Sequence, residues 1–311
     1  MARYAALRLM TALPTLLGVT VVLFITLRLL PGDPVSVLIA EGAATQDGAD
    51  ALRAQFGLDQ PLWRQYVDFL RSVVTLDLGT SYTTRQSVGS MIGGQIAPTL
   101  QLAGAAALVS AVAGIGLGAL AAVHRDRWPD NVIRVLSIVF TAMPNFWLGL
   151  LLIIVFAFTL RVLPATGTDG FSALVLPAVT LGLSASGTIA RLVRNSLIET
   201  MGESFVLALT AKGLHPRAVL LTHVLRNAII PAVTVLGIQL GSLIAGAVIV
   251  ETVFARRGLG QILVQAVASN DFPVIQGVVL VIAVVYIVVN ILVDLSYAQI
   301  DPRVRAAVLS T

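Results

Sequence analysis

A polar stretch between two apolar segments in the last third of the sequence holds the residue types best suited to contacting a soluble partner. It extends from Phe205 to Pro231 and contains the only lysine of the chain, Lys212, which is followed by Gly213. Basic and small residues in this arrangement suit surface recognition, and Lys212 suits a helix end and an interface better than a catalytic role. We therefore expect this loop to form a binding surface for a separate partner protein.

The local pattern predicts two helices joined by a tight turn. Residues 197–212 are expected to form one helix, and Gly213 suits the position after it, because glycine takes a positive φ without steric cost. Lys212 suits the negative end of that helix, and Pro216 suits the first turn of a second helix reaching about Asn227. An ordinary basic loop is the alternative. Five apolar residues recur near one face of the first helix: Leu197, Met201, Phe205, Ala208 and Leu209.

Several kinds of catalytic chemistry are missing from the sequence. No G-x-x-x-x-G-K-[ST] nucleotide cradle and no G-x-S-x-G nucleophile elbow occur. The chain has no cysteine, and His124, His215 and His223 do not form a cluster with metal-ligand spacing. We therefore assign no catalytic residue, no metal ligand and no cofactor to this chain, and we expect it not to be an enzyme.

Three charged residues stand near the ends of apolar segments. Arg28, Glu251 and Asp294 suit interfacial anchoring or an interhelical pair, because long side chains can reach the polar boundary there. The alternative makes Glu251 part of an outer gate, since it directly precedes a loop ending at Phe254. Two rows of small residues favour close helix packing, with a pore-lining face as the alternative: Gly237, Gly241 and Ala245, and Gly114, Gly116 and Gly118.

The composition indicates the kind of structure that must position these residues. Mean hydropathy is +0.92 and only 12% of residues are charged, against about 25% in soluble domains. The chain is therefore predicted to be an all-α integral membrane protein. A nucleic-acid partner is not expected despite the sequence pI of about 10.0, because the net charge is only +4 and the arginines flank apolar segments.

Six apolar segments are long enough to span a bilayer: 9–30, 98–122, 135–160, 173–190, 229–253 and 274–297. The fourth is the weakest, since Pro177 and a Ser/Gly-rich stretch interrupt it. The first is too long for a signal peptide and is expected to be retained. Arginine and lysine are more frequent in the segments on the N-terminal side of the membrane, which predicts that both termini are cytoplasmic.

The predicted organisation has four parts. Residues 1–30 form the first span, 31–97 an extracytoplasmic loop with short helices, 98–303 a core of five spans with the inner loop 191–228, and 304–311 a tail. The outer loop carries seven acidic residues. It suits either a docking surface for an external partner or a solvated loop packed on the bundle, and composition alone leaves both open.

Motifs distributed over the whole chain resemble those of one family. In order they are 30–34 (LPGDP), 56–62 (FGLDQPL), 77–81 (DLGTS), 98–100 (PTL), 144–149 (PNFWLG), 211–213 (AKG), 225–228 (LRNA), 251–254 (ETVF), 258–260 (GLG) and 301–303 (DPR). Together they resemble the membrane permease subunits of ATP-binding-cassette importers for peptides, nickel and related solutes, of the "B" type in the dipeptide/oligopeptide group. The resemblance implies a type I importer permease fold in a bacterial inner membrane.

The resemblance also implies partners and a mechanism. A second homologous permease subunit, two ATPase subunits that bind ATP and Mg²⁺, and an extracytoplasmic solute-binding protein would complete the transporter, which would work by alternating access. The family's coupling motif places its glycine at Gly213 and its proline at Pro231. The leading glutamate of the motif is absent, and residues 207–209 read Leu-Ala-Leu instead. In a separate motif, Arg257 occupies the position where the family has proline.

The residues expected to matter fall into three groups. The ATPase-coupling loop comprises Phe205, Ala208, Ala211, Lys212, Gly213, Leu214, His215, Pro216, Arg226, Asn227 and Pro231. The translocation pathway and gate comprise Pro144, Phe146, Gly237, Gly241, Glu251 and Phe254. The docking surface for the binding protein comprises Asp59, Tyr66, Asp77, Gly258, Gly260 and Asp271.

The solute is expected to be a dipeptide or oligopeptide. The same machinery importing nickel chelates, opines, glutathione or oligosaccharides is the alternative within the class. A self-sufficient secondary carrier or channel would need midplane charges or an ion site, and a membrane-embedded enzyme would need a nucleophile or metal. The sequence offers no pattern for either.

Overall fold

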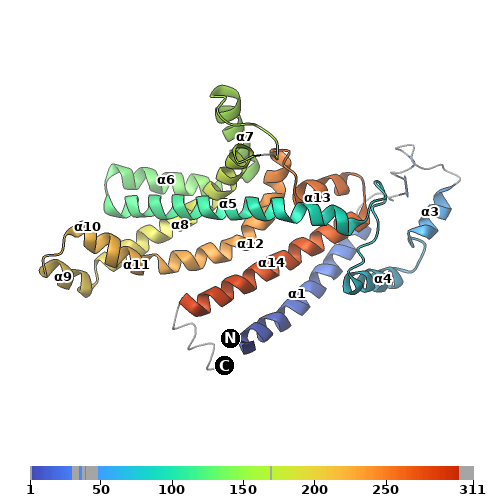
Figure 1. Cartoon of the computed structure of the whole chain (residues 1–311), viewed down its shortest axis with the longest axis horizontal. Helices are drawn as coiled ribbons and strands as arrows, with labels where there is room; N and C mark the ends of the chain where they lie inside the picture. The colour runs from blue at the N-terminus through green and yellow to red at the C-terminus, as the bar shows by residue number, and fades with distance from the viewer. Residues whose placement is uncertain (1, 30–34, 37–38, 40–47, 169, 301–311) are drawn as a thin grey trace. The chain divides into compact units, whose positions relative to one another are not determined.

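The chain divides into two compact units of helices in this computed structural model (Figure 1). The structure describes residues 2–29, 35–36, 39, 48–168 and 170–300, and the side chains among them from 10 to 293. Unit 1 comprises Met1–Thr99 and Arg257–Val288, and unit 2 comprises Leu100–Arg256 and Val289–Thr311. The side chain of Asp294, the 301–303 motif and the predicted tail 304–311 lie outside the described residues.

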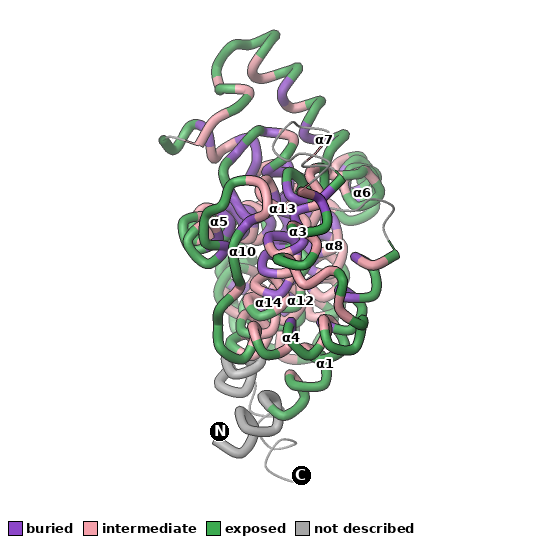
Figure 2. Tube along the Cα trace, turned by 90° about the vertical axis from the view of Figure 1, so that its right-hand side faces the viewer, coloured by how far each residue is buried: buried purple, intermediate pink, exposed green. Residues whose placement is uncertain are grey.

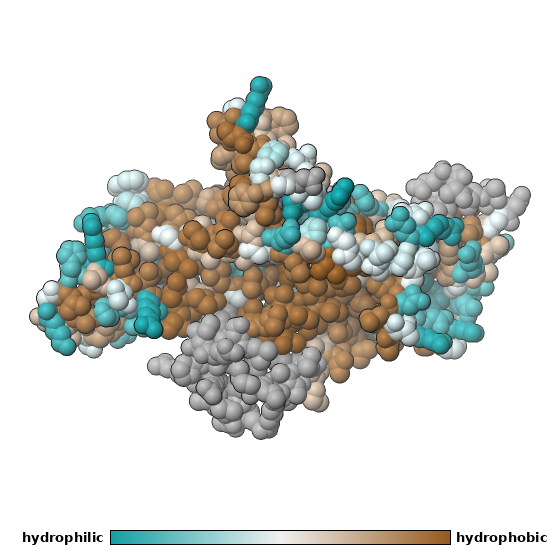
Figure 3. Space-filling view, in the orientation of Figure 1, coloured by the Kyte–Doolittle hydropathy of each residue, from teal (hydrophilic) through white to brown (hydrophobic). Residues whose placement is uncertain are grey.

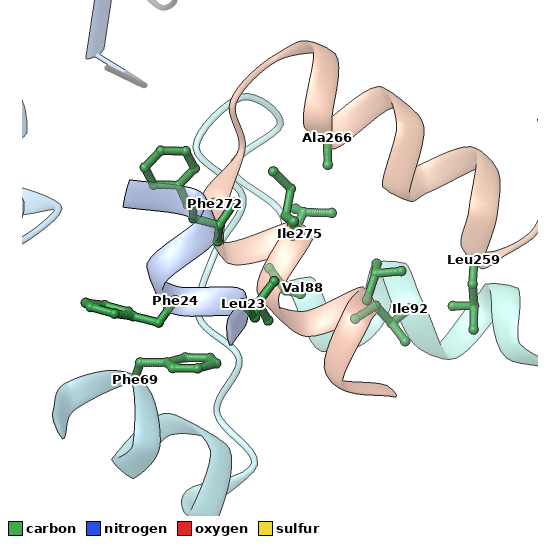
Figure 4. Packing of buried hydrophobic residues seen from close by; sticks show 12 residues of the cluster. Leu23, Phe24, Phe69, Val88, Ile92, Leu259, Ala266, Phe272 and Ile275 are labelled. Carbon is green, nitrogen blue, oxygen red and sulfur yellow. The ribbon is translucent and has the colours of Figure 1, made fainter. Parts of the chain in front are cut away.

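Unit 1 is assembled from segments that are far apart in the sequence. Its helices are α1 (Ala2–Leu29), α3 (Ala49–Gln55), α4 (Leu62–Thr75), the start of α5 (Val88–Val123), α13 (Leu259–Ala268) and most of α14 (Phe272–Ile300). Figure 4 shows the core of this unit, where Phe24 lies beside Phe69 and Leu23 lies near Val88. The short helix α13 was not expected from the sequence, because its ten residues are too few to span a bilayer.

Unit 2 is a bundle around one central helix. Its helices are the rest of α5, α6 (Trp128–Ala142), α7 (Asn145–Leu152), η2 (Ile153–Thr159), α8 (Ser172–Met201), α9 (Ser204–Ala211), α10 (Pro216–Ala218), η3 (Val219–Val224), α11 (Leu225–Ala228) and α12 (Ile230–Val253). Helix α8 contacts α6, α7 and α12, and thirteen of its residues are buried.

The segment expected to be the weakest span is the most buried of the five long apolar helices in the described chain. In α8, 61% of the most apolar 18-residue stretch is buried, against 28–33% of the corresponding stretch in the other four helices. Hydropathy underrates this helix because small and polar residues, such as Ser186 and Gly187, face its neighbours rather than lipid. Pro177 does not break it, since it lies in the second turn, where only one backbone hydrogen bond is lost.

The segment 135–160 is not one straight span. Helix α6 ends at Ala142, and α7 with η2 continues after a bend of 113°. The cause is Pro144, because the residue before a proline is driven out of the helical region, and Met143 is extended at φ −78 and ψ 128. Among the described residues, five helices are long and apolar enough to cross a membrane, or six if this bent pair is one span.

Close backbone approach explains the small residues along α5 and α8. A Cβ added at Gly118 would lie 2.6 Å from the carbonyl oxygen of Ala190, and one at Gly182 would lie 2.7 Å from that of Ala106. Side chains larger than hydrogen cannot fit there without moving a backbone. The packing interpretation therefore holds for Gly118 and for Gly114, which meets Ile189, whereas Gly116 has open space around it.

A buried ion pair joins α6 to α8. The Asp130 side chain is fully buried and accepts two hydrogen bonds from the Arg194 guanidinium, at 2.6 Å each. The backbone N–H of Asp126 donates a third bond at 2.9 Å, and Arg134 lies 3.8 Å away. A carboxylate with bidentate and backbone partners is stable in the interior, whereas either partner alone leaves an uncompensated charge. The sequence analysis did not identify this pair, because its members lie 64 residues apart.

Asp130→Asn is expected to destabilise the protein strongly, by about 3–5 kcal/mol, because it leaves the guanidinium of Arg194 without its charged partner. Thermal unfolding of the purified protein in detergent measures this as a lower midpoint. Asp126→Asn is the matched control, since its carboxylate is 76% exposed and its ion pair is with exposed Arg125. Equal midpoints for the two variants would contradict a structural role for the buried pair.

Candidate functional site

The loop between α8 and α12 forms a helical subdomain at one end of unit 2. Helix α8 ends at Met201, and Glu203 is extended at φ −71 and ψ 149 before α9 begins at Ser204. The single helix expected over 197–212 is therefore wrong, because the chain breaks at Gly202 and Glu203. The break lets α9 leave the line of α8, as Figure 1 shows at the end of the bundle where α9, α10 and α11 gather.

The turn after α9 confirms the expected role of Gly213. This residue has φ +79, a conformation that glycine adopts without the Cβ clash other residues meet. Its N–H donates to the carbonyl of Thr210 at 2.9 Å, and the N–H of Leu214 donates to that of Leu209 at 3.3 Å. These bonds close the carboxyl end of α9, and Lys212 is its C-cap residue.

The second helix begins as expected and then widens. The Nδ1 atom of His215 accepts a hydrogen bond from the backbone N–H of Arg217 at 3.2 Å, and Pro216 occupies the first turn. The helix continues through the π-helical stretch η3 and ends at Ala228, one residue beyond the expected end at Asn227. The helix–turn–helix interpretation therefore holds, with a break before it that was not expected.

One side of this subdomain is packed against the bundle. Val219, Val224 and Ala228 are buried in a cluster with Ile189, Val193 and Leu197 of α8. Val206 and Leu209 of α9 and Leu214 of the turn pack against the same cluster. The subdomain is therefore packed against the part of α8 that includes Ile189, Val193 and Leu197.

The other side of the subdomain is open. Helix α9 has no buried residue, and Leu207 is 75% exposed. Figure 3 shows hydrophilic residues gathered over α9–α11 beside helices covered with hydrophobic residues. Of the eleven predicted coupling residues, Phe205 and Leu214 are half-buried; the exposed ones are Ala208, Ala211, Lys212, Gly213, His215, Pro216, Arg226, Asn227 and Pro231. We call the exposed residues of this list, together with Leu207, the loop surface.

The predicted gate residues at the far end of α12 are buried. Glu251 is fully buried, and its backbone carbonyl accepts a hydrogen bond from the N–H of Arg256 at 2.8 Å. Arg256 is itself only 3% exposed, and burial lowers its pKa while the Glu251 charge opposes that effect. Phe254 is 1% exposed and lies against Gly149, where an added Cβ would be 3.1 Å from its ring. Glu251 is therefore an interior residue and not a lipid-facing anchor.

The remaining pathway residues lie elsewhere in unit 2. Pro144 and Phe146 are exposed at the bend between α6 and α7, along an apolar cleft of about 500 Å³ that Met143 and Trp147 also line. Gly237 and Gly241 are buried within α12. The structure thus brings Glu251 and Phe254 together but does not bring all six pathway residues onto one surface, and their role stays a prediction.

The predicted docking residues all belong to unit 1. Asp59 and Asp77 are exposed, Tyr66 is half-buried, and Gly258 and Gly260 are buried. Because the two glycines are buried in the chain, they cannot themselves present a surface to a partner. The backbone N–H of Leu259, between them, donates to the Thr99 hydroxyl at 2.9 Å, so this turn is fixed from inside.

Asp271 organises a loop rather than facing outward. Its side chain is 2% exposed and accepts hydrogen bonds from the Ser81 hydroxyl at 2.6 Å, the Tyr82 N–H at 3.1 Å, and the Thr83 hydroxyl and N–H at 2.9 and 3.3 Å. Burial raises the pKa of Tyr82 to about 12, with the Arg28 charge opposing and the Asp271 charge adding to the shift. Spacing along the sequence could not have indicated this network, because its members lie about 190 residues apart.

No group of three or more His, Cys, Asp or Glu side chains within the described part of the chain is arranged to hold a metal ion.

Comparison with known proteins identifies the fold and the family. A solved structure of the MetNI methionine ABC transporter in an inward-facing conformation matches with a TM-score of 0.54 and 22% identity, covering 70% of this chain and 95% of that one. The family model "Binding-protein-dependent transport system inner membrane component" matches residues 114–306, and its N-terminal counterpart matches residues 1–103.

Relatives match over almost the whole length. The "Glutathione transport system permease protein GsiC" of Escherichia coli O6:H1 is 39% identical over 305 residues, covering 98% of this chain and 99% of the relative. The protein of the same name from Salmonella typhi has the same identity and coverage. The two family models, the relatives and the apolar helices agree, and the chain belongs to the inner-membrane components of binding-protein-dependent transport systems, with the helical fold of an ABC importer permease.

Proposed function

We propose that this chain forms half of the translocation pathway of an ATP-driven importer for short peptides of the glutathione type. A solute-binding protein would deliver the solute, and a second permease subunit and two ATPases would complete the assembly. The observation that carries the proposal is the basic helix pair formed by α9 and α10–α11. Its loop surface is exposed, and its other side is packed against α8. A chain with no nucleotide cradle needs such a contact to receive energy from a partner.

The proposed mechanism is alternating access. Closure of the ATPases would move the loop surface, and the buried cluster of Val219, Val224 and Leu197 would transmit that movement to α8. Because α8 is tied to α6 through Asp130 and Arg194, the two helices would move together. A packed bundle of this kind switches between discrete arrangements rather than deforming continuously.

The choice of solute rests on the relatives. The chain is similar over its whole length to permeases named for glutathione transport, which favours a small peptide with several carboxylates. Dipeptides and longer peptides are the alternatives, followed by nickel chelates, opines and oligosaccharides. Binding of glutathione, dipeptides and oligopeptides to the cognate solute-binding protein distinguishes them, and failure of all peptides to bind would overturn this choice.

Reconstitution tests the dependence on partners. We expect the chain alone in lipid vesicles to show no solute flux, because the proposed energy source lies in partner subunits. Uptake is expected only when the second permease, the ATPases with ATP and Mg²⁺, and the binding protein are present. Flux of glutathione through the chain alone would instead support a self-sufficient carrier or channel.

Gly213→Val is expected to abolish coupling while leaving membrane insertion intact. A β-branched residue at φ +79 is strained by about 1–3 kcal/mol, although nothing lies within 4 Å of the added Cβ. Solute-stimulated ATP hydrolysis and uptake by the assembled transporter should fall together. Gly213→Asn is the matched control, because asparagine tolerates the left-handed conformation and should retain most of the activity. Full activity of the valine variant would refute a coupling role for this turn.

Asp271→Asn is expected to loosen the 81–83 loop, because an amide offers one acceptor oxygen where the carboxylate offers two. Leaving a buried donor unsatisfied costs about 1–3 kcal/mol, so hydrogen exchange at the Tyr82 and Thr83 amides should accelerate. If the loop helps to dock the binding protein, stimulation of ATPase activity by that protein should weaken too. Asp50→Asn is the control, since Asp50 is 96% exposed, pairs with Arg53 of the same helix and is not a predicted docking residue. Unchanged exchange would show that the network is not needed for loop order.

A further inference from the structure

Helix α4 of unit 1 has two apolar faces, and the core uses only one of them. Tyr66, Phe69 and Val73 point into the core with Phe24 of α1. A second stripe follows the spacing i, i+4, i+7 and i+11 and lies next to the first on the helix circumference. Its members are Trp63, Val67, Leu70 and Val74.

The second stripe is open within unit 1. Trp63 is 69% exposed, Val67 is 51% exposed and Val74 is 83% exposed. Most of α4 has the exposed or intermediate colour in Figure 2. A large tryptophan and two valines in a row are costly to leave in water, at about 25 cal/mol for each Å² of apolar surface. The stripe therefore requires an apolar occupant.

The contacts of α4 set its depth along α1. The Tyr66 hydroxyl lies 3.1 Å from that of Thr20, the Tyr66 ring packs edge-on against Phe24 at 5.2 Å, and Gln65 accepts a hydrogen bond from Arg28. The apolar span of α1 runs from Met10 to Leu29. At 1.5 Å per residue, Thr20 lies about 14 Å from the Leu29 end of that span and Arg28 about 2 Å from it, so α4 contacts one half of the span. Its contact through Gln65 lies at the level where acyl chains give way to headgroups.

The chemistry beside the stripe matches a lipid surface. Arg64 and Arg71 are exposed and lie next to the stripe on the helix circumference. Tryptophan is enriched at the boundary between acyl chains and headgroups, and arginine at the edge of an amphipathic helix can reach lipid phosphates. The stripe also has the same character as the exposed apolar residues at the same end of α1, such as Ile25 at 51% and Leu29 at 78%. The exposed apolar side chains, the neighbouring arginines and the depth of the contacts along α1 thus all favour a lipid surface as the occupant.

We propose that α4 lies in the membrane–water interface, with Trp63, Val67 and Val74 among the lipid acyl chains beside the Leu29 end of α1. The helix is then an anchor that fixes unit 1 at a set depth in the bilayer. This placement rests on the membrane family of the chain and does not depend on the solute or on the energy source.

The absence of cysteine from the sequence makes a direct test practical. Single variants Val67→Cys and Val74→Cys carry a nitroxide spin label in the full-length chain, assembled with cysteine-free partner subunits in phospholipid vesicles. Thr75→Cys is the matched control, because Thr75 is exposed on the polar face one residue beyond Val74. The measurement is the collision rate of each label with oxygen, which concentrates in acyl chains, and with a water-soluble nickel chelate.

At Val67 and Val74 we expect the ratio of oxygen to nickel collisions to be several-fold higher than at Thr75. Low collision rates with both reagents at the stripe would show that another protein subunit covers it, and would overturn the proposal. High nickel collisions at all three positions would show a water-exposed helix and would overturn it equally. Because all three positions are exposed on the surface of unit 1, the substitutions are not expected to prevent folding.

Discussion

The backbone-to-backbone packing of α8 is the constraint on which unit 2 depends. Gly118 brings α5 against the carbonyl of Ala190, and Gly182 brings α8 against that of Ala106, so the helices approach at distances that no larger side chain allows. Within a bilayer, where lipid is as apolar as leucine, such close contact replaces the hydrophobic effect as the source of helix association. The ion pair between Asp130 and Arg194 then fixes α6 to the same helix. A central helix held in this way can transmit force along its length.

One side of the loop between α8 and α12 packs against this bundle, and the other side is exposed. Leu197 of α8 shares a buried cluster with Val219 and Val224, whereas Lys212 and Gly213 are exposed. The proposed coupling to a partner would need this division between a packed side and an exposed side. The conformational demand falls on Gly213, whose positive φ closes α9 and redirects the chain into the second helix.

The core of unit 1 is built from segments that are distant in the sequence, and polar contacts join them. The buried carboxylate of Asp271 collects hydrogen bonds from the 81–83 loop, and Thr99 fixes the turn at Leu259. Asp271 and Thr99 are tolerated in this interior because their side chains are hydrogen-bonded. Helix α4 closes the unit on one side with Phe69 and presents an apolar stripe on the other.

Much of the fold follows from local pattern. Long apolar segments predict the spans, Pro216 predicts the start of the second loop helix, and Gly213 predicts the turn, because each depends on residues within a few positions of one another. Proline could also have indicated the 113° bend, since Pro144 acts on the residue directly before it. The motifs distributed along the chain, taken together, were enough to indicate the family.

Other features were decided by the tertiary structure alone. The sequence identified Glu251 as a border charge and α8 as a weak span, but only packing shows that the first is buried and that the second is the centre of its bundle. The partners in the Asp130 and Asp271 networks come from 64 and about 190 residues away, so no local pattern could pair them. The sequence determined which segments are apolar and where the chain must turn, because these depend on near neighbours. The choice of which surfaces meet was left to the fold, because it depends on shape and charge across long separations.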